Sequence, residues 1–173
     1  HVLRASYFKS FPEIREYFKW VSRLVECAGR VPCLAWNAEK GEVEILRWRG
    51  GVDFPAGCNN GFQALLADIM KRAYVTMTRE GYLGVKDDGS PSPLAGARFP
   101  VVMHDEPVSE LIECTAHLSG PRVGEIMEEA GRALAPDVTW VAKTAIAKRL
   151  SKSMEPVYED GKLVLWVPEA KAT

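Results

Sequence analysis

The sequence predicts an α+β fold in which helices pack against antiparallel strands. Two observations carry this prediction. Apolar residues recur at helical spacing in three stretches, near residues 12–28, 59–81 and 119–134. Between them, residues 33–49 and 97–113 each hold two apolar runs joined by a few polar or turn residues, the pattern of a β-hairpin. Helices mixed with antiparallel hairpins are typical of the α+β class.

Length and composition are ordinary for a globular domain. The chain has 173 residues, 47% of them hydrophobic and 26% charged, which predicts one domain with a sizeable core. The net charge of −1 gives no nucleic-acid footprint unless basic residues gather on one face. Four cysteines without a CxxC pair, and the lack of a signal peptide or long apolar run, predict free, mostly buried thiols in a reducing compartment, the cytoplasm. Because the chain starts at His1 without a Met, we expect a fragment or a processed product.

The N-terminal part is predicted to hold a helix and a hairpin. Ser10 is expected to cap the helix, Pro12 to lie in its first turn and Gly29 to end it. The hairpin is expected to start near Cys33, turn at residues 39–41 and end at a Gly-Gly pair. We expect residues 1–50 to form this part, and residues 51–173 to form a second part around the central hairpin.

The second part begins with the longest helical pattern. Its expected buried stripe consists of Leu65, Leu66, Ile69, Met70, Ala73 and Met77. A Gly- and Pro-rich segment, residues 84–96, predicts a mobile loop before the central hairpin. After the hairpin, Ser119-Gly120-Pro121 is expected to open a helix that runs to about Leu134, and residues 138–147 and 163–167 are expected to be strands.

The turn of the central hairpin carries the chemistry-bearing side chains His104, Asp105 and Glu106. Adjacent carboxylates at an exposed turn repel each other, so such a site favours a divalent cation that neutralises them. The alternative is a solvated turn, because Asp is common at hairpin tips. Both interpretations stay open at this stage.

Two further residue pairs are candidates for contacts with nucleic acid. Asn59 and Gln63 are four residues apart and therefore share a helix face, where amides could read the acceptor-rich minor groove of a duplex. The alternative makes Asn59 a helix cap and Gln63 an ordinary surface residue. Arg47 and Arg49 could contact the DNA backbone, or could simply be solvated at a strand edge.

Taken together, these pieces resemble the C-terminal part of family A DNA polymerases, the bacterial DNA polymerase I type, especially the phage members. Tyr7-Phe8-Lys9-Ser10-Phe11-Pro12 is similar to the aromatic-aromatic-x-x-Phe-Pro opening of the helix that follows the fingers. Asn59-x-x-x-Gln63-x-x-x-x-Asp68-Ile69-Met70-Lys71 resembles the family's Asn-x-x-x-Gln-Gly-x-x-Ala-Asp-x-x-Lys helix. His104-Asp105-Glu106 matches the third catalytic motif. The resemblance covers roughly residues 5–150.

The resemblance implies a part of the palm, an antiparallel sheet with packed helices in the right-hand polymerase fold. It implies that Asp105 and Glu106 bind magnesium in a two-metal site, that His104 lies near the primer 3′ end, and that Asn59 and Gln63 contact the minor groove. The implied reaction is template-directed DNA synthesis, with primer–template DNA and deoxynucleoside triphosphates as substrates. Two metal ions about 3.5–4 Å apart can activate the primer hydroxyl and stabilise the leaving pyrophosphate.

The sequence also departs from the family pattern. The Asp-x-x-x-x-Glu strand that supplies the other metal-binding aspartate is absent, and so is the fingers helix that grips the triphosphate. Ala64 and Pro107 stand where the family has a glycine and an aliphatic strand residue. We therefore expect another chain or an upstream segment to supply the missing parts. The alternatives are a non-enzymatic DNA-binding or interaction module with the palm fold and, less favoured, an unrelated metal-dependent hydrolase.

Overall fold

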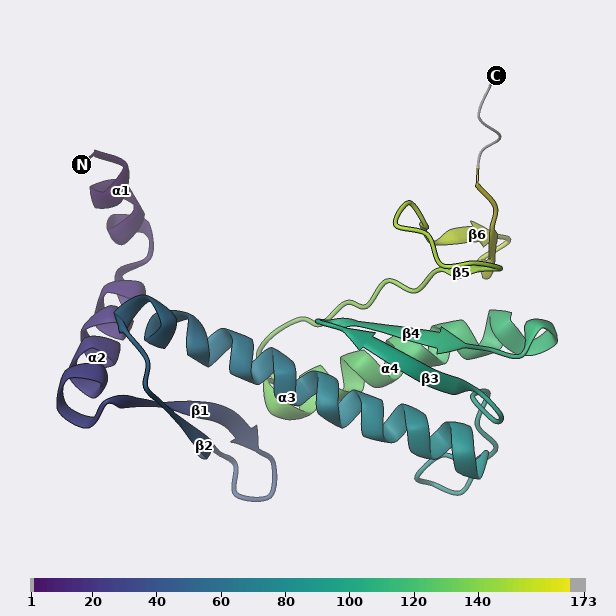
Figure 1. Ribbon diagram of the computed structural model, residues 1–173, viewed down its shortest axis with the longest axis horizontal. Coiled ribbons are helices and arrows are strands. Elements are labelled where there is room, and N and C mark those ends of the chain that lie inside the picture. Colours follow the sequence, from purple (N-terminus) through teal and green to yellow (C-terminus); the bar gives the residue numbers. More distant parts are fainter. Residues whose placement is uncertain (1, 169–173) are drawn as a thin grey trace. The chain divides into compact units, whose positions relative to one another are not determined.

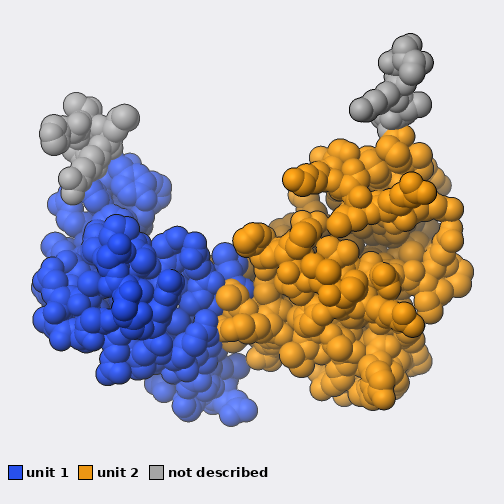
Figure 2. Space-filling model, in the orientation of Figure 1, with its two compact units in different colours: residues 1–66 blue, residues 67–173 orange. Residues whose placement is uncertain are grey.

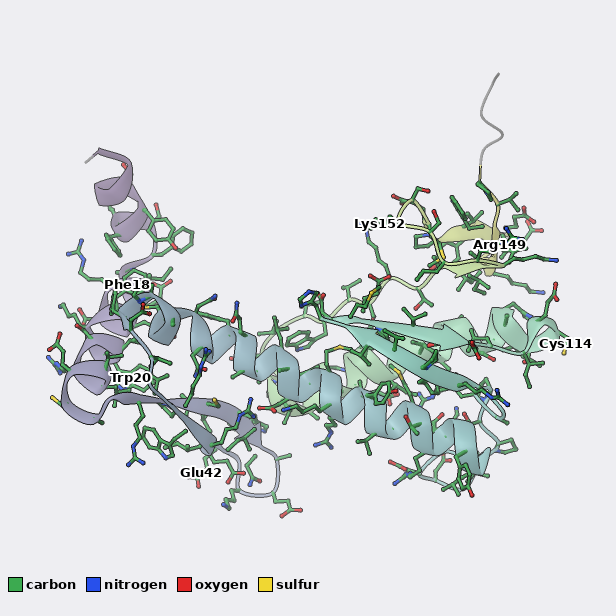
Figure 3. The ribbon with its side chains drawn as sticks, in the orientation of Figure 1. Phe18, Trp20, Glu42, Cys114, Arg149 and Lys152 are labelled. Carbon is green, nitrogen blue, oxygen red and sulfur yellow. The ribbon has the colours of Figure 1, made fainter. Side chains whose placement is uncertain are left out.

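The computed structural model describes residues 2–168, with side chains from residue 6 onward. The chain divides into two compact units, residues 1–66 and residues 67–173 (Figure 2). Helix α3 (Phe54–Leu83) contributes its first part to unit 1 and its second part to unit 2. The expected division after residue 50 stays a prediction. In the part of the chain that the structure describes, no helix is long and apolar enough to cross a membrane.

Unit 1 contains two helices and a hairpin in addition to the start of α3 (Figure 1). Helix α1 (Val2–Ser10) is followed directly by α2 (Pro12–Ala28), and strands β1 (Arg30–Asn37) and β2 (Glu42–Gly50) form an antiparallel pair. The predicted hairpin and its turn are confirmed. Val31, Cys33 and Ala35 of β1 are buried, so one face of the hairpin belongs to the core of this unit.

The ends of α2 explain one correct and one wrong prediction. Gly29 ends the helix as expected, because its φ of +61° lies in the left-handed region that glycine adopts without strain. Ser10 does not cap α2, since it is the last residue of α1 and Phe11 occupies the capping position without a side-chain hydrogen bond. Pro12 lies at the first turn, where a missing N–H costs no helical bond.

Unit 2 contains the rest of α3, the hairpin of β3 (Arg98–Met103) and β4 (Glu106–Glu110), and α4 (Ala116–Leu134), which follows a short 3₁₀ turn (Glu113–Thr115). Helix α4 starts three residues before the predicted Ser119 and contains Pro121 within its first turns. Of the predicted α3 stripe, Ile69, Met70, Ala73 and Met77 are buried. Leu66 is instead 43% exposed, a correction to that stripe.

The strands of the described residues form three small sheets rather than one palm sheet. The β1–β2 and β3–β4 hairpins are separate two-stranded sheets, and β5 (Ile146–Ala147), β7 (Lys162–Trp166) and β6 (Val157–Glu159) form a third in that order. Strand β5 pairs with β7 in parallel. The α+β class is therefore confirmed, whereas the single antiparallel sheet is not observed.

The predicted strand over residues 138–147 is wrong except for its last two residues. This segment instead follows α4, where the Trp140 indole N–H donates to the Ala135 carbonyl at 3.0 Å and the Ala142 N–H donates to Glu128 at 3.0 Å. The Trp140 ring lies so close to Gly131 that a Cβ there would overlap it. Side-chain packing on a helix thus replaces the alternating contacts of a sheet.

Candidate functional site

The predicted catalytic turn is a tight two-residue connection. Met103 pairs with Glu106 at the end of the β3–β4 ladder, which leaves only His104 and Asp105 between the strands. Figure 1 shows the turn at the end of the hairpin away from the loop of residues 84–96. The hairpin therefore holds His104, Asp105 and Glu106 on consecutive positions with little room for rearrangement.

The backbone at His104 has an uncommon conformation. Its φ of +57° is left-handed, a region that most side chains avoid but that histidine tolerates better than branched residues. Left-handed conformations at a non-glycine residue cost about 1–2 kcal/mol. They occur preferentially at functional positions, where the surrounding structure enforces them. In this turn, the conformation lets two residues reverse the chain and sets the direction of the imidazole.

All three side chains of the turn are exposed. Within residues 2–168, none of them takes part in a hydrogen bond or an ion pair, so the carboxylate oxygens of Asp105 and Glu106 keep their lone pairs available. A charged group without a hydrogen-bond partner in the protein is usually hydrated or bound to a ligand. The arrangement places two exposed carboxylates on consecutive residues at the end of the hairpin.

The support consists of contacts between β3 and the second part of α3. The Tyr74 hydroxyl donates to the Phe99 carbonyl, and the two rings meet edge to face with centroids 6.3 Å apart. Gly81 permits this close approach, because a Cβ at that position would lie 2.8 Å from the Ala97 carbonyl oxygen. The base of the hairpin is thus fixed by a helix, while its turn remains open.

A buried ionic cluster that the sequence analysis missed fixes the loop at that base. Glu80 of α3 is 1% exposed and receives two hydrogen bonds from Arg122 of α4, at 2.6 and 3.2 Å. Ser92 of the loop donates to the same carboxylate at 2.6 Å and accepts from the Leu94 N–H at 3.0 Å. Leu94 is fully buried. The loop predicted to be mobile is therefore anchored at its centre.

The charges in this cluster are well compensated. Burial alone raises the pKa of the Glu80 carboxyl, but the hydrogen bonds from Arg122 and Ser92 and the charge of Arg122 outweigh it and hold the pKa below its ordinary value. Hydrogen bonding to Glu80 in turn raises the pKa of Arg122. Arg122 also donates to Glu129 at 2.9 Å and to Glu125 at 3.2 Å. A cluster satisfied in this way has a structural role.

A sequence signal for this cluster did exist. Glu80 continues the buried stripe of α3, three residues after Met77 and seven after Ala73, so an acid falls on an apolar helix face. Arg122 interrupts the apolar pattern of α4 in the same way, four residues before Ile126. Oppositely charged residues on two buried stripes predict an ion pair between the helices.

The amide pair on α3 belongs to unit 1, whereas the turn belongs to unit 2. Asn59 and Gln63 are both exposed on one face of α3, next to the 64% exposed Phe62. Asn59 cannot be the helix cap, because α3 begins at Phe54 and Asp53 accepts from the Ala56 N–H at 2.9 Å. Minor-groove reading by Asn59 and Gln63 stays a prediction.

Asn60, which the sequence analysis passed over, is the buried amide of this helix. It is 2% exposed, and its amide nitrogen lies 3.5 Å from both the Pro32 carbonyl oxygen and the Cys33 sulfur. Arg49 donates to its side-chain oxygen at 3.4 Å. Arg47 and Arg49 are themselves exposed on β2. A DNA contact by the two arginines also stays a prediction.

A magnesium site at the turn is chemically reasonable for the two carboxylates that the described residues place there. Magnesium binds one or two carboxylates and takes its remaining ligands from water and substrate phosphates, so Asp105 and Glu106 suit one part of its coordination shell. Among residues 2–168, no group of three or more His, Cys, Asp or Glu side chains is arranged to hold a metal ion. The two acids therefore fit the ion as a partial donor set.

Comparison with known proteins gave no match. No family model matches the sequence, and neither a curated protein nor a solved structure is significantly similar to the chain.

Proposed function

We propose that this chain is the palm part of a family A type DNA polymerase and takes part in template-directed DNA synthesis. The observation that carries the proposal is the turn itself: an acid pair preceded by a left-handed histidine, exposed and unpaired among the described residues, on a hairpin anchored to a helix. Together with the order of the sequence motifs, this geometry favours a ligand-binding turn over a merely solvated one.

In the proposed reaction, Asp105 and Glu106 hold magnesium through their carboxylates. When bound, the metal ions would supply activation of the primer hydroxyl and charge stabilisation for the leaving pyrophosphate. The short turn limits the movement of both acids, which maintains the geometry that in-line displacement needs. His104 donates a hydrogen bond toward the primer end, from a direction fixed by its left-handed backbone.

The other proposed contacts are made by residues that the structure leaves accessible. Asn59 and Gln63 would accept and donate hydrogen bonds at the minor-groove edge of the nascent base pair. A second aspartate and the triphosphate-binding helix would come from another chain or an upstream segment. We place this assembly in the cytoplasm of a bacterial or phage-infected cell.

Primer extension tests the proposal. We expect no magnesium-dependent extension by the 173-residue chain alone, and extension when a candidate chain with the missing aspartate and fingers is added. In that assembly, Asp105→Asn should abolish extension, because a lost metal ligand removes several kcal/mol of transition-state stabilisation. Glu106→Gln should reduce it less. Near-normal extension by Asp105→Asn would refute the assignment.

A second variant tests the amide face. Gln63→Ala should weaken primer–template binding or raise misincorporation in the active assembly, without loss of thermal stability. Since Gln63 is exposed and Asn60 carries the structural contacts of this turn of α3, Asn60→Ala is the contrasting variant and should lower stability. Unchanged binding and fidelity in Gln63→Ala would remove the minor-groove role.

A further inference from the structure

The outer edge of β2 is an open strand edge that carries large apolar and charged side chains in equal number. Strand β2 pairs only with β1 in the described part of the chain, and every residue of β2 except Glu44 is exposed. Its four large apolar side chains, Val43, Ile45, Leu46 and Trp48, are between 43 and 60% exposed. An edge strand of this length with apolar side chains is a template for pairing with another strand.

The β1–β2 register defines which β2 side chains share a face. Directly opposed residues of an antiparallel pair point to the same side. Val43 and Trp48 oppose Trp36 and Pro32 of β1, so both lie on the outer face of the hairpin. The charged residues oppose the inner positions instead: Glu42, Glu44, Arg47 and Arg49 pair with Asn37, Ala35, Cys33 and Val31.

The order of residues along β2 is self-complementary. Residues 42–44 are acid, apolar, acid, and residues 47–49 are arginine, apolar, arginine. When the strand is reversed, each acid is therefore matched by an arginine and each apolar residue by an apolar residue. The register shift beside Leu34 leaves Leu46 as an extra residue in β2. In a regular strand, residues an odd number of positions apart point to opposite faces. The bulge adds one residue, so Glu42 and Arg49 share a face of β2, and so do Glu44 and Arg47.

We propose that β2 pairs antiparallel with β2 of a second copy of this chain, about a two-fold axis between Ile45 and Leu46. In this register Glu42 faces Arg49 of the second copy, and Glu44 faces its Arg47. On the other face, Val43 meets Trp48 of the second copy. Opposite charges across the pair and apolar contacts on its outer side are the features that stabilise adjacent strands, and a two-fold contact uses each of them twice.

The contacts that Glu44 and Arg49 make within one copy are compatible with the pairing. Glu44 has an exposed ion pair with Lys40 at 2.8 Å, and Arg49 reaches Asn60 only at 3.4 Å. Exposed ion pairs such as Lys40–Glu44 exchange readily with new partners. The contact of Arg49 with the buried Asn60 amide lies at the long end of hydrogen-bond distances. The interface assigns the two arginines to protein carboxylates rather than to DNA phosphates, and it does not depend on the proposed catalytic role.

Sedimentation velocity of the full chain with charge-reversed variants tests the pairing over roughly 1–300 µM, the range of weak specific association. The acid-reversed variant carries Glu42→Arg and Glu44→Arg, and the base-reversed variant carries Arg47→Glu and Arg49→Glu. The wild-type chain should dimerise, and each variant alone should associate at least about tenfold more weakly because like charges meet. An equimolar mixture of both variants should form a heterodimer.

The control Glu39→Arg/Glu155→Arg has the same net charge as the acid-reversed variant, but its substitutions lie outside the paired strand. It should dimerise like the wild type. If the base-reversed variant fails to fold, the acid-reversed variant and this control decide the question. A monomeric wild-type chain, or an acid-reversed variant that dimerises as tightly as the control, would overturn the proposal. So would a mixture of folded variants without heterodimer.

Discussion

Two acidic regions of unit 2 differ in almost every physical respect. Glu80 is buried and bound by Arg122 and Ser92, whereas Asp105 and Glu106 are exposed and unpaired among the described residues. The first arrangement consumes the carboxylate in holding α3, α4 and a loop together. The second leaves two carboxylates accessible to solvent. The presence of acidic residues alone therefore does not identify a functional site. Their burial and their hydrogen-bond partners distinguish a carboxylate that stabilises the fold from one that is accessible to a ligand.

The largest effect should come from breaking the buried pair. Arg122→Met leaves Glu80 charged and without its main partner in the interior, which typically costs about 3–5 kcal/mol. Urea unfolding measures the loss. The matched control is Arg132→Met on the same helix, where the exposed arginine pairs with Glu128 at 3.3 Å and the cost should stay below about 1 kcal/mol. Equal stability of the two variants would show that the cluster is not a support.

Acid should weaken the same support. The pKa of Glu80 is lowered in the folded chain, so the unfolded chain binds more protons. The contribution of Glu80 to stability is therefore present above the ordinary glutamate pKa and is lost as the pH falls through the lowered value. Urea unfolding from about pH 7 to about pH 3 should show this decline, and Glu80→Gln should make the curve flatter. If the stability of Glu80→Gln fell with pH as steeply as that of the wild type, Glu80 would not contribute to stability as a charged partner of Arg122.

The stability of the turn should depend on the backbone conformation that residue 104 can adopt, and not on its charge. His104→Val places a branched side chain in the left-handed region and should cost about 1–2 kcal/mol. His104→Gly should leave stability nearly unchanged, since glycine adopts this φ freely. Thermal unfolding distinguishes the two. If valine is tolerated as well as glycine, the left-handed turn does not form in solution.

Much of the fold could be predicted from the sequence, but its tertiary contacts could not. The hairpins at residues 30–50 and 98–110 and the stop of α2 at Gly29 follow from local patterns and turn chemistry. Local patterns place Glu80 and Arg122 on the buried stripes of α3 and α4, but they do not show that the two side chains meet, which depends on how the helices pack. The segment after α4 was misread because the fit of Trp140 against Gly131 is a tertiary contact.

The candidate site shows the same limit. The acid pair and its turn were found by their spacing alone, and the structure adds the left-handed histidine and the absence of partners within the described residues. The structural role of Asn60 could not be predicted from the sequence, because neighbouring helix positions point in different directions and local spacing does not show which one faces the core. Only the fold showed that Asn60 is the buried amide.

We propose that the exposed acid pair at the β3–β4 turn binds a divalent cation. Titration of the isotope-labelled chain with Mn²⁺, followed by amide NMR, tests it directly, because a bound paramagnetic ion broadens nearby signals. We expect selective broadening of the His104, Asp105 and Glu106 signals, and we expect excess Mg²⁺ to reverse it. The broadening should be lost in Asp105→Asn. The free energy of unfolding of this variant should stay within about 0.5 kcal/mol of wild type. Broadening that is absent at this turn, or that is unchanged in the variant, would show that Asp105 and Glu106 do not bind the cation.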